Sequence, residues 1–214
     1  MLNSLFFAIC LLLCSCSTNE SSTPTFTWQQ FCCRDQGTPK DRLILYRAKV
    51  PTHWIRRDPL PEDSISDSTR PNCEFYIGET SPIHFTFHTF PTDTFEQRIP
   101  PEAQIGRWKR QFDEIDLSTL LIEPRALGGF TGLSFYAEGS LNGKEHSILG
   151  FSMQLASLHW RTLQAQNGPS FKQRQMASDY TLKAIGAPES ITTYKSEIEL
   201  FANSFELIEE IPIR

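Results

Sequence analysis

The dipeptide Asn142-Gly143 lies between two stretches rich in alternating apolar residues, and in that setting it is the strongest short-range signal for a β-hairpin. A two-residue turn at this position sets the register and places Tyr136 opposite Leu149. On the other face Phe135 stands opposite Gly150, so both faces of the hairpin carry apolar residues. Because a solvated face would be polar, we expect an antiparallel sheet with helices above and below it.

Other segments predict the remaining elements of an α+β domain. We expect strands over 42–50, 73–77, 83–90 and 179–185, where β-branched and aromatic residues gather. The residues that mark two helices by their spacing are Ile105, Trp108, Phe112 and Ile115 after Pro100-Pro101-Glu102, and Ile191, Tyr194, Ile198, Phe201 and Phe205 near the end. Pro124 and Gly128-Gly129 are expected to break the chain after the first helix. Residues 161–178 could be helical in part, and the proline-rich segment 56–72 is expected to be a long loop.

The N-terminal residues have the pattern of an export signal. Residues 5–14 are ten apolar residues without charge, about half of the roughly 20 that a membrane-spanning helix needs. The sequence Leu13-Cys14-Ser15-Cys16 resembles the lipobox of bacterial lipoproteins, in which a signal peptidase cuts before a cysteine that carries a diacylglyceryl group. Cys16 fits the lipid-bearing position, because Leu13 stands three residues before it and Ser15 is small. The alternative is an ordinary secretory signal cleaved after Ser15 or Ser17, without lipid.

The lipobox resemblance implies an exported protein that is anchored to a bacterial membrane by its lipid. We favour the outer membrane over the inner membrane, and we expect two acyl chains to hold stably where one would hold only marginally. The expected organisation is a signal peptide over 1–15, a flexible polar tether over 16–39 and one globular domain over 40–214.

Charge and cysteine content narrow the partners and the chemistry. The net charge is −5 and the one basic cluster is Arg107-Trp108-Lys109-Arg110, so we expect no nucleic-acid partner. Export favours a disulfide, and Cys73 could pair with Cys32 or with Cys33; we take Cys33 and Cys73 as the candidate pair. The alternative is that these thiols stay reduced.

No motif for catalysis, a metal or a cofactor holds up in this sequence. Ser134 and Ser152 follow a glycine at the spacing of a nucleophile elbow, but the final glycine of G-x-S-x-G is missing in both cases. His84 and His88 lie in an expected strand, which separates them by about 13 Å and excludes a shared metal ion. We therefore predict no catalytic residue, no metal ligand and no cofactor, with the two histidines on a half-buried face of the sheet.

The order of elements resembles that of a known superfamily. An early strand ends in Val50-Pro51-x-x-Trp54, two strands, a helix and the glycine-containing hairpin follow, and the strand at 180–186 leads into a closing helix that ends at Ser204-Phe205. Over residues 40–210 this order is similar to the PsbP-like superfamily, which includes DcrB-like bacterial lipoproteins. The resemblance implies a PsbP-like α/β/α sandwich, an antiparallel sheet between helical layers. It also implies a domain that binds other proteins and has no catalytic motif to transfer.

Two classes of function follow. The favoured one is a lipid-anchored, non-catalytic module that binds an envelope protein through the loop 56–72, with Trp54, Arg56 and Arg57 as the candidate partner surface. The alternative is a small-molecule-binding or hydrolytic envelope protein with a pocket against the sheet.

Overall fold

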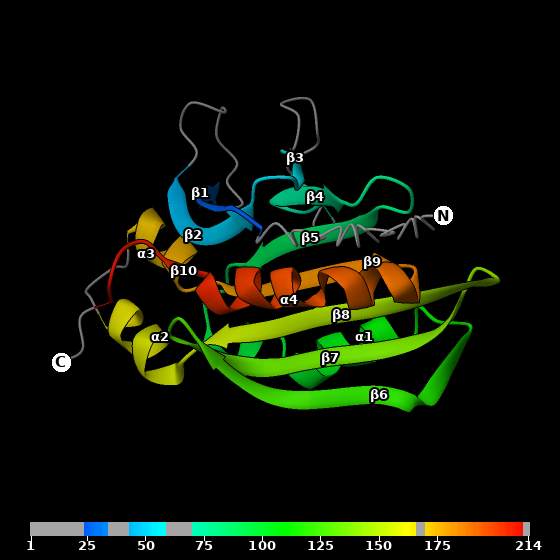
Figure 1. Ribbon diagram of the computed structural model, residues 1–214. Coiled ribbons are helices and arrows are strands. Elements are labelled where there is room, and N and C mark those ends of the chain that lie inside the picture. The colour runs from blue at the N-terminus through cyan, green and yellow to red at the C-terminus, as the bar shows by residue number, and fades with distance from the viewer. Residues whose placement is uncertain (1–23, 34–42, 59–69, 166–169, 212–214) are drawn as a thin grey trace, which may run out of the picture.

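The computed structural model describes residues 24–33, 43–58, 70–165 and 170–211, which form an α+β domain (Figure 1). A large antiparallel sheet has seven strands in the order β3-β4-β5-β9-β8-β7-β6, and a small sheet has three in the order β1-β2-β10. The strands are β1 (Phe26–Cys32), β2 (Ile44–Pro51), β3 (Ile55–Arg57), β4 (Cys73–Ile77), β5 (Ile83–Phe90), β6 (Glu114–Leu127), β7 (Phe130–Leu141), β8 (Lys144–Leu155), β9 (Asp179–Gly186) and β10 (Glu206–Leu207). The helices are the 3₁₀ turn η1 (Phe95–Gln97), α1 (Pro101–Lys109), α2 (Ser157–Gln164), α3 (Phe171–Met176) and α4 (Pro188–Ser204).

The hairpin predicted at Asn142-Gly143 is confirmed. These two residues join β7 to β8 and have φ angles of 52° and 72°, as a two-residue hairpin turn with two left-handed positions requires. Tyr136 is paired with Leu149, the register that the turn predicts.

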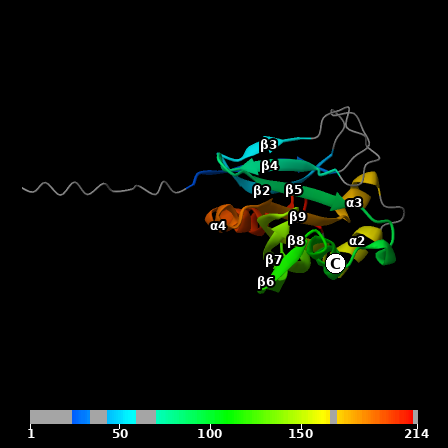
Figure 2. The same ribbon diagram turned by 90° about the vertical axis from the view of Figure 1, so that its right-hand side faces the viewer.

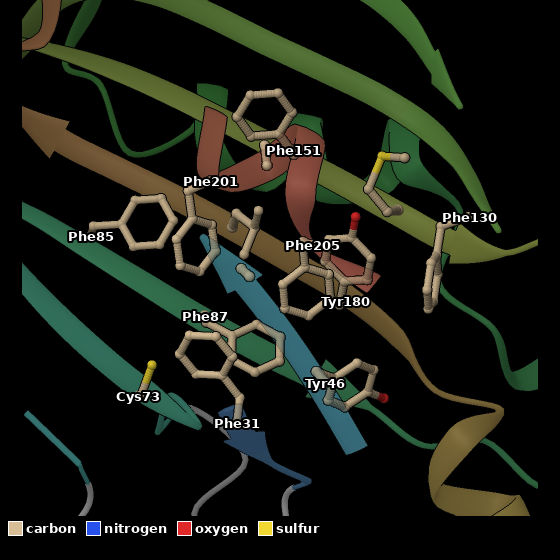
Figure 3. Close-up of a cluster of buried hydrophobic side chains, with 14 of the residues drawn as sticks. Phe31, Tyr46, Cys73, Phe85, Phe87, Phe130, Phe151, Tyr180, Phe201 and Phe205 are labelled. Carbon is tan, nitrogen blue, oxygen red and sulfur yellow. The ribbon is translucent and has the colours of Figure 1, made fainter. Parts of the chain in front are cut away.

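The large sheet is covered on both faces, which confirms the expected α+β sandwich. Helix α4 and the small sheet lie over one face, and α1 lies behind the other (Figures 1 and 2). Phe31, Tyr46, Phe87 and Phe205 meet in the main core between the two sheets, where Tyr46 and Phe205 stack with ring centroids 5.3 Å apart (Figure 3). The small sheet therefore shares a layer with α4, an arrangement that the sequence analysis did not predict.

A second, smaller core lies under α1. Ile105, Trp108 and Phe112 pack against Phe135 and its neighbours on β7 and β8. This packing accounts for the apolar residues on the second face of the hairpin.

Three expectations about the elements are wrong. Residues 26–32 lie within the expected tether but form β1, because they pair with β2 and Phe31 is buried in the main core. Helix α1 ends at Lys109, so Ile115 belongs to β6 instead. The break expected at Pro124 is absent, because Pro124 lies on the outermost strand of the sheet, where a missing backbone donor is tolerated. None of the helices in the described part of the chain is long and apolar enough to span a membrane.

Candidate functional site

A polar groove lies beside α1 on the face of the large sheet that this helix covers only in part. Helix α1 packs mainly against β7 and β8, and the groove, about 670 Å³ in volume, extends over β4, β5 and β9. The residues that line it are Glu74, His84, Thr86, His88, Phe90, Thr181 and Lys183 from the sheet, Gln104, Arg107, Trp108 and Gln111 from α1 and the turn after it, and Pro71 and Ile99 from the segments before β4 and before α1.

The alternation of strand residues puts polar side chains into this groove. In β5, Phe85 and Phe87 point into the main core, and His84 and His88 lie half-buried on the opposite face, as predicted. This placement follows because successive side chains of a strand point to opposite faces of the sheet.

The strand register then gathers groups that are far apart in the sequence. Glu74 of β4 is paired with Thr86 of β5, and Thr86 is paired with Lys183 of β9. These three residues form one row across the floor of the groove.

Two cations of the groove have neutral partners. Lys183 Nζ donates a hydrogen bond to Gln111 Oε1 over 3.4 Å, and Arg107 Nη1 donates to Gln104 Oε1 over 3.4 Å. Neither cation takes part in any of the ion pairs formed between described residues. Burial lowers the pKa of Lys183, because its charged form loses hydration in the groove.

The carboxylate that lines the groove, that of Glu74, has a histidine and a tyrosine as its partners. Glu74 Oε2 lies 3.4 Å from His84 Nε2, an ion pair when the imidazole is protonated, and it accepts a hydrogen bond from the Tyr76 hydroxyl over 3.3 Å. The Tyr76 and His84 rings stack with their centroids 5.3 Å apart. The Glu74 carboxylate thus interacts with Tyr76 and His84 at one end of the row, and the Lys183 ammonium lies at the other end.

This arrangement suits the binding of an acidic group. Two cations approach the groove from different elements, one from the sheet and one from the helix, and hydroxyl and amide groups lie around them. Within the described ranges, no group of three or more His, Cys, Asp or Glu residues could hold a metal ion.

The two serines considered as nucleophiles lie within strands. Ser134 is 5% exposed and Ser152 is 4% exposed, and the Ser134 hydroxyl accepts a hydrogen bond from Arg125 Nε over 3.0 Å. A strand-to-helix turn that would present either hydroxyl is not found at these positions.

The predicted partner surface is wrong for Trp54, which is 5% exposed. Its indole stacks on Phe201 with centroids 5.8 Å apart, and its Nε1 donates to Glu197 Oε2 over 2.9 Å. Arg56 is half-buried, lies over the Phe31 ring at 4.8 Å and donates to the Gln30 carbonyl, so it fastens β3 to β1. Arg57 is exposed, and loop residues 59–69 lie outside the described residues.

The structure also places the cysteines that were considered for a disulfide. Cys33 and Cys73 are buried in the main core, and burial raises the pKa of the Cys73 thiol far above its usual range. The carbonyl of Cys32 accepts a hydrogen bond from Asn72 Nδ2 over 3.2 Å, so the residue before Cys73 touches β1. A disulfide from Cys73 to Cys33 or Cys32 stays a prediction, and Cys16 lies outside the described residues.

The histidine face is predictable from the strand pattern, but Lys183 and Arg107 are not recognisable from the sequence as parts of one site. In the sequence, Lys183 lies in an expected strand and Arg107 is one residue of a basic cluster. They are joined by the antiparallel pairing of β5 with β9, which places Lys183 beside the histidine strand, and by the position of α1, and no local pattern supplies either.

Comparison with known proteins gives no family model that matches this chain and no curated protein that matches it. Among solved structures, LpqN of Mycobacterium tuberculosis, described as involved in cell envelope biogenesis, is 14% identical, with 85% of this chain and 91% of that chain covered and a TM-score of 0.47. Cyanobacterial PsbP (CyanoP) from Synechocystis is 13% identical, with 85% and 92% covered and a TM-score of 0.46. Neither likeness transfers a function to this chain.

Proposed function

We propose that this protein is a lipid-anchored lipoprotein of a bacterial envelope and that its folded domain is a non-catalytic binding module. Its binding site is the groove beside α1, and its ligand is an acidic segment of an envelope protein. The observation that carries the proposal is the pair Lys183 and Arg107, two groove cations with neutral amide partners in a chain whose net charge is −5.

A half-buried ammonium without a counter-ion is unfavourable, because burial removes water and nothing charged replaces it. A carboxylate that enters the groove would supply that counter-ion. It would also raise the lowered pKa of Lys183 toward its ordinary value, because a nearby negative charge favours the charged form. Pro71, near the end of the segment 56–72, is one of the residues that line the groove.

The groove is tested with poly-L-glutamate as the probe. We expect Lys183→Gln and Arg107→Gln each to weaken binding by about 10- to 100-fold, since hydrogen bonds to charged groups contribute about 1.5–3 kcal/mol. The matched control is Lys195→Gln, an exposed cation on α4 that lies over Tyr136. Equal binding by wild type, the groove variants and the control would overturn the site assignment.

A capture experiment then tests the protein partner. The anchored protein is cross-linked in intact cells and isolated from detergent-solubilised envelope. We expect one partner to be recovered with wild type and with Lys195→Gln, and to be absent with Lys183→Gln. A partner recovered equally with all three proteins would show that it binds elsewhere.

The lipid anchor is tested by labelled palmitate. We expect Cys16→Ala to abolish the label and release the protein from membranes, while Cys14→Ala keeps both, because Cys16 follows a small residue and Leu13 stands three residues before it. Label that persists in Cys16→Ala but is lost in Cys14→Ala would move the site, and no label in wild type would leave an unlipidated secreted protein.

The alternative function is the binding of a small molecule in the same groove. Its volume of about 670 Å³ favours this possibility, because ligand pockets commonly measure about 300–1,000 Å³. Native mass spectrometry of protein purified from the envelope distinguishes the two. A bound species of discrete mass that is lost in Lys183→Gln would support the small-molecule alternative.

A further inference from the structure

The outer face of the small sheet carries an exposed tryptophan between two cations. Trp28 is 52% exposed, whereas Trp54, Trp108 and Trp160 are 5%, 2% and 8% exposed. The guanidinium of Arg47 lies 5.1 Å from the centroid of the Trp28 ring, and Lys49 Nζ lies 5.6 Å from it.

The strand pairing explains why these groups share one face. Trp28 of β1 is paired with Lys49 of β2. Arg47 lies two residues before Lys49, so its side chain is on the same side of β2. Tyr46 and Ala48, which alternate with these cations, are buried. The small sheet therefore presents a cationic and aromatic surface to the outside and an apolar surface to the core.

Glu206 is the acidic neighbour of this surface. Its carboxylate lies 2.6 Å from Arg47 Nη2, in a pair whose two side chains are 45% and 37% exposed. No ion pair among the described residues includes Lys49. The face thus keeps a positive balance in a molecule with a net charge of −5.

This surface belongs to the folded element nearest to the expected anchor. Strand β1 begins at Phe26, ten residues after Cys16. An extended chain of that length spans at most about 35 Å, so β1 is held within that distance of the membrane surface.

We propose that the outer face of the small sheet, formed by Trp28, Arg47 and Lys49, rests on the anionic lipid surface to which the chain is tethered. Tryptophan is enriched where hydrocarbon meets headgroups, and arginine and lysine near a membrane are attracted to anionic lipids. The proposal uses the lipid anchor of the proposed function but not the groove.

Charge also decides between lipid and a second copy of the chain. Two copies placed face to face would bring Arg47 and Lys49 close to their own counterparts, and like charges repel. Outside this face and the basic cluster 107–110 the molecule is acidic, so an anionic surface repels most of it and attracts this face. The bilayer therefore turns the domain with the small sheet toward the lipid.

The test uses the mature protein purified from membranes and mixed with vesicles of phosphatidylethanolamine and phosphatidylglycerol that contain brominated lipid. Bromine quenches tryptophan fluorescence at short range, and Trp28 is the exposed tryptophan among the four. We expect quenching in wild type and its loss in Trp28→Phe, in Arg47→Gln with Lys49→Gln, and in vesicles of phosphatidylcholine alone. The charge control is Arg110→Gln with Lys144→Gln, which should quench as wild type does.

The outcomes separate this inference from the proposed function. Acylated protein whose fluorescence is unquenched in phosphatidylglycerol vesicles, or equally quenched in Trp28→Phe, overturns the docking face and leaves the anchor and the groove standing. If Cys16 carries no lipid, the same quenching is measured at high vesicle concentration. Quenching that depends on Trp28 and falls with added salt supports the outer face of the small sheet as the docking face, and its absence overturns it.

Discussion

At the scale of single residues, Gly150 decides whether α1 can lie on the sheet. A Cβ built at this position would stand 2.5 Å from a carbon of the Trp108 indole. Trp108 is 2% exposed and has no room to withdraw, because Phe135 and Ile148 pack around it in the smaller core. The close approach of ring and backbone therefore requires glycine here.

We expect Gly150→Ala to lower the free energy of unfolding by about 1–3 kcal/mol, the usual cost of overpacking a core. Urea unfolding followed by circular dichroism measures it. The control is Gly106→Ala in α1, where the nearest atom to an added Cβ is the end of the flexible Arg110 side chain at 3.6 Å. That change should stabilise by up to about 1 kcal/mol, because alanine is the better helix former. Equal stability of the two variants would contradict this packing.

Arg98 and Asp179 form a buried ion pair that fastens the segment before α1 to the sheet. The two side chains are 3% and 6% exposed, Arg98 Nη2 lies 2.5 Å from Asp179 Oδ1, and the same nitrogen donates to the Leu155 carbonyl over 2.6 Å. Desolvation raises the pKa of Asp179, and the guanidinium of Arg98 opposes that shift.

We expect Arg98→Met to destabilise the protein by about 3–5 kcal/mol, because it leaves the Asp179 carboxylate buried without its counter-ion. The double variant Arg98→Met with Asp179→Leu should recover much of that loss, since both charges are gone. As a control, Arg47→Met removes the exposed pair with Glu206 and should cost at most about 1 kcal/mol. A cost for Arg98→Met as small as that of the control would show that the pair is not structural.

At the scale of elements, the end of α4 fills the centre of the main core. The helix ends at Ser204, and the next residue, Phe205, turns its ring between Tyr180 and Phe87, with centroid distances of 4.4 Å and 4.9 Å (Figure 3). Phe205 is fully buried, so it joins the helix, the small sheet and the large sheet at one point.

We expect Phe205→Ala to cost about 3–5 kcal/mol, the range for removing a buried aromatic ring. Phe171→Ala on α3 is the matched control, because Phe171 is 43% exposed and its loss should change stability by less than about 0.5 kcal/mol. Thermal unfolding of both variants gives the comparison. A Phe205→Ala protein as stable as the control would mean that the core closes without this ring.

The elements also show what could be predicted from the sequence. The β7–β8 hairpin was predictable because Asn142-Gly143 determines turn and register locally. Strand β1 was missed because it follows a polar tract and Phe31 is its one side chain buried in the core, against Phe75, Phe87, Phe201 and Phe205, which lie far along the chain. Trp54 was misplaced because its position beside a loop says nothing of Phe201, on which it packs. Lys183 and Arg107 come together only through strand order and helix placement.

At the scale of the whole molecule, one sheet separates two cores but also joins them. The larger core lies between the sheet, α4 and the small sheet, and the smaller core lies under α1. Strand β8 contributes to both, since Leu149 and Phe151 face the larger core and Ile148 faces the smaller one. Loss of either core exposes the same strands, so neither should persist without the other.

We therefore expect one cooperative unfolding transition, as is usual for a single domain of this size. Phe112→Ala, in the smaller core, should lower the free energy of unfolding by about 3–5 kcal/mol. The unfolding midpoints seen by far-UV circular dichroism and by tryptophan fluorescence should fall by the same amount as each other. Trp54 reports on the larger core and Trp108 on the smaller one, so Trp108→Phe isolates the signal of the larger core. If that signal kept the wild-type midpoint in the Phe112→Ala background, the two cores would unfold separately, and α1 with its side of the groove could open while the rest stays folded.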